Sequence, residues 1–273
     1  MKGLLRQQGK RAVLQHLMDV MRNVASEAGM AIMAVRADGF VTGWKADASP
    51  VTKADKAAEA IILSRLAEAF PDIPAMAEEA CSEGMEGCAT KTGFFLIDPL
   101  DGTREFVAGR NEFTVNIALV QAGRPVAGVV FAPALNEMYA GSALGAFRWC
   151  TPYGDAEPIS ARDYVPEAAV ALASRSHRTG QTDLFLERLQ PAQIVSMGSS
   201  LKFCRIAEGV ADIYPCFGTT MEWDTAAGEA VLEAAGGTVR TPDGLTLTYG
   251  KHERLGRGGF ANPEFIATGR TAG

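Results

Sequence analysis

Histidine and cysteine are scarce in this chain of 273 residues, which has three of the former and five of the latter. No C-x-x-C pair occurs, and no spacing of cysteine and histidine matches a zinc site. These absences argue against the usual zinc-binding and disulfide-framework classes. We therefore expect free, reduced thiols and a cytoplasmic protein; the cysteines are Cys81, Cys88, Cys150, Cys204 and Cys216.

Long apolar runs are also missing. The longest largely apolar stretch, Val126 to Leu135, is too short to cross a bilayer and contains Pro133. The basic N-terminal region is followed by Gln15, His16 and Asp19, so it lacks the apolar core of a signal peptide. We expect a soluble protein without a transmembrane segment, and peripheral attachment to the inner membrane stays open.

An excess of positive charge is absent too. Lysine and arginine number 26 against 32 aspartates and glutamates, which gives a net charge of −6. This balance argues against a general nucleic-acid binder, which would present a basic surface. It does not argue against a phosphorylated substrate, because bound Mg²⁺ reverses the local field. The content of 47% hydrophobic and 21% charged residues is that of an ordinary globular protein.

The pattern of apolar residues predicts an α/β or α+β chain in two halves. Helical spacing covers residues 12–34 and 52–70, and residues 113–120 and 126–131 have the pattern of a β-hairpin. The polar stretch Thr151 to Pro158 is the expected boundary between an N-terminal α+β half, residues 1–155, and a C-terminal α/β half, residues 156–273. We also expect strands at 146–150, 169–174 and 194–197, and helices at 183–189, 201–208 and 225–235.

The first string that points to chemistry is Asp98-Pro-Leu-Asp101-Gly-Thr103. It follows the apolar run Phe94 to Ile97, which predicts a buried strand that ends where the acids begin. Pro99 fixes φ and lacks an N–H, so a stiff turn is expected there, followed by a short helix over residues 104–108. Two carboxylates, a backbone carbonyl and free N–H groups at one turn suit Mg²⁺ and a phosphate together.

A second string, Trp223-Asp-Thr-Ala-Ala-Gly228, supplies another acid. Asp224 stands just ahead of a strong helix-forming segment that ends at Gly236-Gly237. Capping of this helix is the simplest interpretation of Asp224 alone, and Asp-Pro-x-Asp-Gly alone is a common turn. The two strings together, with the acidic pair Glu78-Glu79 upstream, favour a shared site.

The order of these strings resembles the lithium-sensitive, Mg²⁺-dependent phosphomonoesterases of the inositol monophosphatase superfamily. Asp55, Glu78-Glu79, Asp98 to Thr103 and Trp223 to Gly228 occur in the order of its signature, and the resemblance covers about residues 20–268. It is greatest to the bacterial 3′(2′),5′-bisphosphate nucleotidases of the CysQ type. The strings that carry this closer resemblance are Ser49–Thr52, Glu105-Phe106, Asn111–Leu119, Ser174–His177, Gly198–Cys204, Ala207–Gly209 and Asp224–Gly228.

The resemblance implies an α+β fold, a layered α-β-α-β-α sandwich of the inositol monophosphatase and fructose-1,6-bisphosphatase type, with the site between the halves. It also implies two Mg²⁺ ions, with a third not excluded. Glu78, Asp98 and the Leu100 carbonyl would hold the first ion. Asp98, Asp101 and Asp224 would hold the second.

Catalysis would then need no covalent nucleophile. By the same resemblance, Thr103 and Glu78 would orient a water molecule and help to deprotonate it. Asp55 is assigned a supporting catalytic role, and Asp55 and Glu79 would stand behind the ligands or at a weak third metal. The adjacent serine and histidine of Ser174–His177 are not expected to align as a triad, and this segment is assigned to the wall of the substrate pocket.

A substrate pocket beside the metals is the further implication. Gly198-Ser-Ser200 leads into a helix whose N–H groups and hydroxyls would meet a second phosphate, with charge from Lys202. A capped helix with a solvated lysine is the alternative. The expected substrate-binding residues are Glu78, Leu100, Asp101, Gly102, Thr103, Ser174, Ser199, Ser200, Lys202 and Asp224.

Two departures from the relatives' pattern affect this pocket. Cys216 and Thr219 stand where an arginine and a proline are expected. If that arginine contacts the nucleotide phosphate in relatives, then affinity falls here, or Arg254 and Arg257 substitute for it. Otherwise the glycine-bearing segment around Arg254 and Arg257 is expected to be an ordinary surface loop. Nucleotide selectivity is affected by these departures, whereas the metal chemistry is not.

The leading hypothesis is a Mg²⁺-dependent phosphatase that converts adenosine 3′,5′-bisphosphate into AMP and phosphate, with a role in sulfur assimilation. A second hypothesis is an inositol-phosphate or sugar-phosphate phosphatase on the same scaffold, and a third is a metal-binding protein without catalysis. The serines near Lys202 favour the first hypothesis, and Cys216 weakens it. The presence of all the acids and of Thr103 argues against the third. The expected partner is a small phosphorylated substrate and not a nucleic acid, and a monomer or a homodimer is expected.

Overall fold

The computed structural model describes residues 2–44, 50–82, 93–151, 154–251 and 257–271. Its helices are α1 (Lys2–Asp38), α2 (Lys53–Ala69), α3 (Glu78–Ser82), α4 (Thr103–Val107), α5 (Gly180–Leu189), α6 (Leu201–Ala207) and α7 (Glu222–Ala234), with 3₁₀ turns η1 (Pro166–Ala168) and η2 (Arg257–Phe260). Its strands are β1 (Gly43–Trp44), β2 (Pro50–Val51), β3 (Ala75–Ala77), β4 (Phe94–Asp101), β5 (Thr114–Gln121), β6 (Arg124–Ala132), β7 (Glu137–Ser142), β8 (Gly145–Trp149), β9 (Glu157–Pro158), β10 (Val170–Ser174), β11 (Gln193–Met197), β12 (Ile213–Cys216), β13 (Thr238–Arg240) and β14 (Phe265–Thr268).

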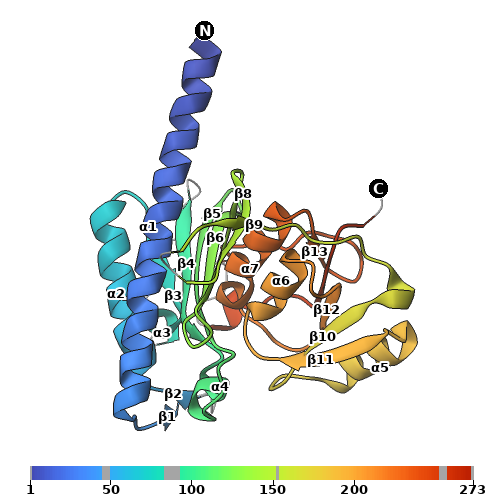
Figure 1. Cartoon of the computed structure of the whole chain (residues 1–273). Coiled ribbons are helices and arrows are strands. Elements are labelled where there is room, and N and C mark those ends of the chain that lie inside the picture. The colour runs from blue at the N-terminus through green and yellow to red at the C-terminus, as the bar shows by residue number, and fades with distance from the viewer. Residues whose placement is uncertain (1, 45–49, 83–92, 152–153, 252–256, 272–273) are drawn as a thin grey trace.

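Helices and sheets alternate in layers across the molecule (Figure 1). Within the described residues, the first large sheet has seven strands in the order β3-β4-β5-β6-β7-β8-β9. The second has five, in the order β11-β10-β12-β14-β13. Helices α1 and α2 cover the outer face of the first sheet, α6 and α7 lie between the sheets, and α5 covers the outer face of the second. This confirms the predicted α-β-α-β-α sandwich.

Apolar residues on both faces of β4 explain why the first sheet is covered on two sides. Phe95 and Ile97 belong to the core shared with α1 and α2, whereas Phe94 and Leu96 belong to the core shared with α6 and α7. Successive side chains of a strand point to opposite faces. The continuous apolar run in the sequence is therefore that of a strand buried on both sides.

Strand β4 does not end where the sequence predicts. It continues through Pro99 to Asp101, and a β-bulge stands in place of the expected turn. Asp98 lies opposite Asn116 of β5 and Asp101 lies opposite Thr114, so three steps on β4 match two steps on β5. Proline cannot donate to the hydrogen-bond ladder, and a bulge leaves one residue unpaired, which is why the strand tolerates a proline here.

Helix α7 packs closely against the first sheet at two glycines. Gly128 of β6 and Gly141 of β7 are partners across the strand pair. A methyl group at Gly141 would stand 2.6 Å from the Ala230 carbonyl oxygen of α7, and one at Gly128 would stand 2.8 Å from the Ala230 Cβ. Only a residue without Cβ leaves room for the helix backbone at these two positions.

The other predicted elements are mostly present, with shifted ends. The hairpin of β5 and β6 turns at Ala122 and Gly123, both of which have positive φ. Helix α7 begins at Glu222, so Asp224 lies in its first turn rather than ahead of the helix. The sequence pattern did not predict α3 or the strands β1, β2, β3, β7, β9, β12, β13 and β14, most of which are too short to give a clear period. The division of the chain near residue 155 stays a prediction.

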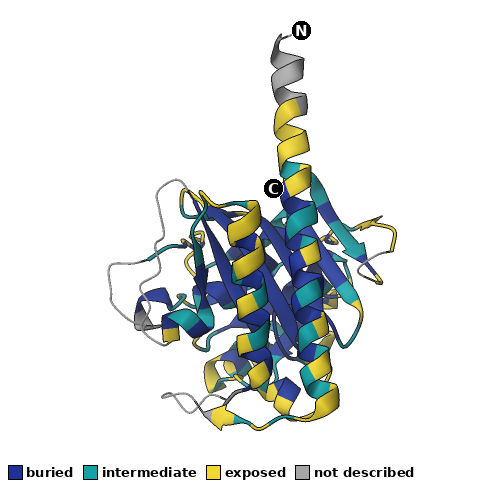
Figure 2. Ribbon diagram, turned by 90° about the vertical axis from the view of Figure 1, so that its left-hand side faces the viewer, coloured by how far each residue is buried: buried dark blue, intermediate teal, exposed yellow. Residues whose placement is uncertain are grey.

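Helix α1 extends beyond the first sheet at its N-terminal end (Figure 2). Residues 9–13 are exposed there, whereas Met21, Ala25, Ala28 and Ile32 are buried against α2 and the sheet. The apolar face that the sequence predicts over residues 12–34 is thus the part of the helix that packs. In the described part of the chain, no helix is both long enough and apolar enough to span a membrane.

A buried acid links α7 to the first sheet. Glu229 is fully buried, accepts a hydrogen bond from the Tyr249 hydroxyl and lies 2.7 Å from a guanidinium nitrogen of Arg124 on β6. The same arginine pairs with Glu233 at 2.7 Å. Burial raises the pKa of Glu229 from its ordinary value of 4.5 to about 7, although Tyr249 and Arg124 oppose the shift. The folded protein therefore holds a proton here over a range of pH in which the unfolded chain has lost it.

The close packing of α7 on the glycines of the first sheet predicts that Gly141→Ala is destabilising. Because the new methyl group would overlap the α7 backbone, we expect a loss of about 1–3 kcal/mol in the free energy of unfolding. Urea unfolding measures this loss. Gly9→Ala is the matched control, because Gly9 is an exposed helical residue with open space around its Cβ position, and it should gain up to about 1 kcal/mol. Equal effects at both positions would contradict the packing argument.

The raised pKa of Glu229 predicts how stability depends on pH. Between about pH 4.5 and 7 only the folded state binds the proton of Glu229. The stabilisation that this proton gives to the folded state is therefore lost as the pH rises through this window. The contribution amounts to roughly 3 kcal/mol. Glu229→Gln removes it, so unfolding free energies at pH 5 and pH 7.5 should differ less in this variant than in the wild type. Glu187→Gln, on the exposed side of α5, should retain the wild-type difference.

Candidate active site

A cavity of about 310 Å³ brings together residues from both sheets and from the helices between them. Asp55 and Ser200 do not line this cavity; each is almost wholly buried behind it. The sequence-predicted residues that line it are Glu78, Asp98, Leu100, Asp101, Gly102, Thr103, Ser174, Ser199, Lys202 and Asp224.

The bulge in β4 places two acids on one side of the first sheet. Asp98 and Asp101 are three residues apart and would face opposite sides of a regular strand. Their partners Asn116 and Thr114 are two residues apart on β5 and share a face, so the extra residue in β4 returns Asp101 to the side of Asp98. The amide of Asn116 accordingly donates to Asp101 Oδ2 at 3.3 Å. Both acids face the layer that contains α7.

Thr103 is held in place by Asp55 of α2. The Thr103 hydroxyl lies 3.2 Å from Asp55 Oδ1 and 3.1 Å from the Leu100 carbonyl oxygen. The other oxygen of Asp55 accepts hydrogen bonds from the Thr52 N–H at 2.7 Å and from the Thr52 hydroxyl at 2.8 Å. Asp55 thus closes the capping box of α2 and also orients Thr103.

The acidic pair Glu78-Glu79 starts α3, immediately after β3. Glu59 of α2 is buried behind it and accepts hydrogen bonds from the N–H groups of Glu79 at 2.9 Å and Ala80 at 3.0 Å. A carboxylate at a helix start stabilises the free N–H groups there. Glu59 therefore fixes the segment from which Glu78 reaches the cavity. The sequence analysis did not single out Glu59, because its partners lie about 20 residues away.

Asp224 approaches from the opposite side, in the first turn of α7. Its Oδ2 accepts the N–H of Met221 at 2.7 Å, so Asp224 caps α7 from the third helical position, whereas the N-cap residue itself is Met221. Asn262 also holds this turn, because its amide donates to the Met221 carbonyl at 2.7 Å and lies 3.0 Å from the Thr225 hydroxyl. Neither the sequence pattern nor the spacing points to Asn262.

The start of α6 forms another wall. Ser199 has a φ of 51°, and its carbonyl accepts a hydrogen bond from Lys202 Nζ at 2.6 Å. Lys202 is buried, with its ammonium 4.9 Å from the centre of the Tyr214 ring. Burial lowers the pKa of Lys202 and raises the pKa of Asp101, while the attraction between the two charges opposes both shifts. The solvated lysine that the alternative interpretation supposed is not found.

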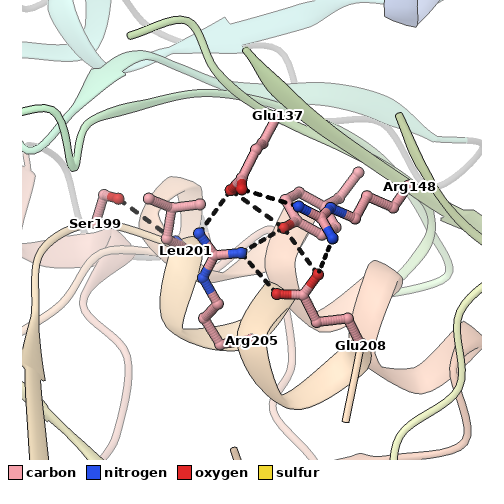
Figure 3. Close-up of polar contacts among 7 residues, drawn as sticks. Glu137, Arg148, Ser199, Leu201, Arg205 and Glu208 are labelled. Carbon is pink, nitrogen blue, oxygen red and sulfur yellow. Dashed lines mark hydrogen bonds and ion pairs between the residues drawn. The ribbon is translucent and has the colours of Figure 1, made fainter. Parts of the chain in front are cut away.

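An ion network fixes the other end of α6 (Figure 3). Arg205 pairs with Glu208 at 2.6 Å and with Glu137 of β7 at 2.6 Å, and Arg148 of β8 pairs with both glutamates at 3.3 and 3.0 Å. The Tyr139 hydroxyl accepts a hydrogen bond from Arg205 at 2.7 Å. Two positive and two negative charges therefore balance at the junction of α6 with the first sheet.

Comparison with known proteins assigns this chain to a family. A model of the inositol monophosphatase family matches residues 13–269. The chain belongs to the inositol monophosphatase family. It is 44% identical over 252 residues to the 3′(2′),5′-bisphosphate nucleotidase CysQ of Escherichia coli K12, which covers 91% of this chain and 98% of that protein. The protein of the same name from Buchnera aphidicola is 39% identical, covering 94% and 95%.

Solved structures of the family have the same architecture. The crystal structure of CysQ from Bacteroides thetaiotaomicron superposes with a TM-score of 0.76 at 34% identity, covering 92% of this chain and 97% of that one. The inositol monophosphatase of Thermotoga maritima gives a TM-score of 0.74 at 26% identity, covering 93% and 92%.

Several lining residues of this family member were not in the predicted set. Arg104 and Glu105 follow the first string directly, and Ser176 donates to Glu105 Oε1 at 2.5 Å. His177 lies in the segment assigned to the pocket wall, and burial, with a further effect of Arg104, lowers its pKa. The signal for Arg104 and Glu105 was their position next to the motif. Only folding brings Ser176 to them.

Both departures from the relatives' pattern lie at the cavity. Cys216 of β12 is buried and lines it, as does Thr219. Burial raises the pKa of the Cys216 thiol, so it is neutral and supplies no charge to replace an arginine. Arg254 lies outside the described residues, and only the backbone of Arg257 is described. The proposed replacement of the missing arginine by these two residues therefore stays a prediction.

The donor set of the cavity is chemically suited to a hard divalent cation, because carboxylates and carbonyl oxygens are the ligands that Mg²⁺ prefers. Glu78, Asp98, the Leu100 carbonyl, Asp101 and Asp224 all belong to the lining. Within the described residues, no three Asp, Glu, His or Cys side chains are grouped closely enough to count as a metal site. The two-ion arrangement implied by the resemblance therefore stays a prediction.

The contacts of Thr103 predict the effect of Thr103→Ala. Its hydroxyl is held by Asp55 and the Leu100 carbonyl, in the position expected for orienting water rather than binding metal. We expect kcat to fall by about 10²–10³-fold, while the dissociation constant for Mg²⁺ changes little. Thr103→Ser keeps the hydroxyl and should retain most of the activity. A large rise in the Mg²⁺ dissociation constant of Thr103→Ala would instead assign Thr103 to the structure of the turn.

Proposed function

We propose that this protein is a 3′(2′),5′-bisphosphate nucleotidase that hydrolyses the 3′-phosphate of adenosine 3′,5′-bisphosphate to give AMP and phosphate. The observation that carries the proposal is one cavity whose lining combines several carboxylates with the basic side chains of Arg104, His177 and Lys202. A substrate with two phosphates matches such a cavity. The relatives that bear this activity in their name align with almost their whole length.

The phosphatases of this family depend on metal ions, generally Mg²⁺. We propose that Glu78, Asp98 and the Leu100 carbonyl hold one ion and that Asp98, Asp101 and Asp224 hold a second. When bound, such ions lower the pKa of a coordinated water and stabilise the leaving oxygen. A carboxylate has about four acceptor positions, so the hydrogen bonds that Asp98 and Asp224 already accept are compatible with coordination.

The protein residues orient the attack and handle the proton. Thr103 directs its own proton to Asp55 or to the Leu100 carbonyl, so its oxygen accepts a hydrogen bond from the attacking water. The water oxygen forms the new bond to phosphorus as the bond to the 3′-oxygen of the ribose breaks. Glu78 helps to take the proton of the water, and the 3′-oxygen is protonated as AMP leaves. No side chain forms a covalent bond to the phosphate.

The second phosphate is proposed to lie beside the basic residues of the cavity. Lys202 supplies a positive charge beside Ser199, and Arg104 and His177 also line the cavity. The neutral thiol of Cys216 favours the alternative function, an inositol-phosphate or sugar-phosphate phosphatase, because it removes one expected contact to a nucleotide phosphate. A protein without catalysis does not explain why Thr103 is held so closely by Asp55.

Other properties stay predictions. The cytoplasmic location, the sensitivity to lithium, the role in sulfur assimilation and the choice between monomer and homodimer are all proposed from the resemblance and from the sequence. The free thiols of the described cysteines fit a reducing compartment: Cys81, Cys150, Cys204 and Cys216 form no disulfide in the part of the chain that the structure covers.

The test of the proposed function compares kcat/KM for adenosine 3′,5′-bisphosphate, inositol 1-phosphate and fructose 1,6-bisphosphate, each with Mg²⁺ and with a chelator. The first should be the best substrate. Lys202→Met, which keeps the apolar stem, should lower kcat/KM for the nucleotide by about ten- to hundredfold. It should affect inositol 1-phosphate much less, because that substrate lacks the second phosphate.

The ratio between the substrates decides the outcome, since a general loss of structure would lower both values together. A wild-type preference for inositol 1-phosphate or for fructose 1,6-bisphosphate would replace the proposal by the alternative function. Equal losses in Lys202→Met would remove Lys202 from the recognition of the second phosphate. If none of the three substrates is hydrolysed in the presence of Mg²⁺, only the metal-binding hypothesis is left.

A further inference from the structure

Ser200 makes a set of contacts that differs from its predicted role at a substrate phosphate. Its side chain is almost wholly buried, and it does not belong to the lining of the cavity. Its N–H donates to Asp101 Oδ2 at 2.6 Å, and its hydroxyl lies 2.7 Å from the same oxygen. The hydroxyl also lies 2.7 Å from the main-chain carbonyl oxygen of Asp224. One small residue thus touches two of the proposed metal ligands, which come from opposite sides of the site.

These neighbours use the one proton of the hydroxyl and one of its two lone pairs. A serine hydroxyl has one proton to donate and two lone pairs to accept with. Its proton is shared between Asp101 Oδ2 and the Asp224 carbonyl, and it accepts a hydrogen bond from the Asn116 amide at 2.9 Å. A buried hydroxyl in such a network has no favourable way to turn toward a substrate.

Asn116 completes the arrangement from β5. It is fully buried, and its amide nitrogen is within hydrogen-bond distance of both the Ser200 hydroxyl and Asp101 Oδ2. It is also the strand partner of Asp98, on the other side of the bulge. Asn116 therefore ties the position of Ser200 to the strand pair that carries Asp98 and Asp101.

The position of Ser200 is itself well determined. It directly precedes α6, whose far end is fixed to β7 by the ion pair of Arg205 with Glu137 and to β8 by the ion pair of Glu208 with Arg148 (Figure 3). The helix between these ends is buried over most of its length. Because α6 is held at its far end, Ser200 is held in place as well, and it fixes the positions of Asp101 Oδ2 and the Asp224 carbonyl by its hydrogen bonds.

We propose that Ser200, supported by Asn116, is a positioning residue that sets the distance between Asp101 and the Asp224 segment, and thereby the affinity of the site for a divalent cation. This inference rests on the proposed function only in that Asp101 and Asp224 are taken as metal ligands. Groups that hydrogen-bond to metal ligands orient them, and their loss typically lowers metal affinity or activity by about 10–100-fold. Ser200 acts through Asp101 and Asp224 and does not touch the substrate.

The test measures cation binding without substrate, on the full-length protein. Mn²⁺ is the probe, followed by its paramagnetic signal, with Mg²⁺ calorimetry as a second measurement. Ser200→Ala should raise the dissociation constant for Mn²⁺ by about tenfold or more. Ser199→Ala is the matched control: its residue is adjacent and lines the cavity but makes no described contact to Asp101 or Asp224, so the dissociation constant should stay near the wild-type value.

Kinetics separate a positioning role from a substrate contact. In Ser200→Ala, added Mg²⁺ should restore kcat, and KM for adenosine 3′,5′-bisphosphate at saturating Mg²⁺ should stay near the wild-type value. Ser200→Thr keeps the hydroxyl and should restore cation affinity. An unchanged Mn²⁺ dissociation constant together with a raised KM in Ser200→Ala would overturn the proposal and return Ser200 to the substrate-binding set.

The outcome does not depend on which phosphomonoester is the substrate. If the wild type binds Mn²⁺ but does not hydrolyse the nucleotide, the proposed function fails, and the binding comparison still decides the role of Ser200. If the wild type does not bind Mn²⁺, the positioning proposal itself is overturned. Should Ser200→Ala fail to fold, Ser200→Cys fills the same space with a much weaker hydrogen-bonding group, and the same rise in the dissociation constant is expected of it.

Discussion

The bulge at Pro99 and Leu100 is the constraint on which the site depends. If β4 continued as a regular strand without the bulge, Asp101 would point into the apolar layer under α1 and α2, where Phe95 and Ile97 already lie. With it, both acids face the inner helical layer. Pro99, which the bulge accommodates, lies between Asp98 and Asp101, the two acids that the bulge brings to one face. Local backbone chemistry at one strand end thus determines which face of a seven-stranded sheet carries charge.

Helices α6 and α7 bring the remaining residues of the site to the two acids of β4. Gly128 and Gly141 let α7 lie on the sheet, which brings the first turn of α7 across from β4. The N-terminal end of α6 then fits between the two, where Ser200 touches both Asp101 and the Asp224 carbonyl. Close approach of the layers is therefore part of the chemistry, since Asp98 and Asp101 come from β4 and Asp224 comes from α7, which packs against that strand.

The two acidic strings and the layered fold could be predicted from the sequence, because each string combines an unusual order of acids with a definite local structure. The bulge could not, since Pro99 alone is equally consistent with a turn, and only the pairing with β5 decides. Glu59, Asn116 and Asn262 were missed for a similar reason: a single buried polar residue has no pattern, and its partners lie elsewhere in the chain. The place of Ser200 behind the cavity, next to Ser199, which lines it, is likewise decided by tertiary contacts.

The place of α7 in the chain has a consequence for synthesis on the ribosome. The strands of the first sheet end at Pro158, whereas the helix that covers their inner face begins at Glu222, 64 residues later (222 − 158). At about 5–20 residues per second, translation of that interval takes roughly 3–13 seconds. Throughout this time the inner apolar residues of β4 and β6, such as Leu96 and Val130, lack the cover of α7. The nascent chain therefore exposes an apolar face of the sheet for several seconds. Chaperones that bind exposed apolar segments have this time to bind it.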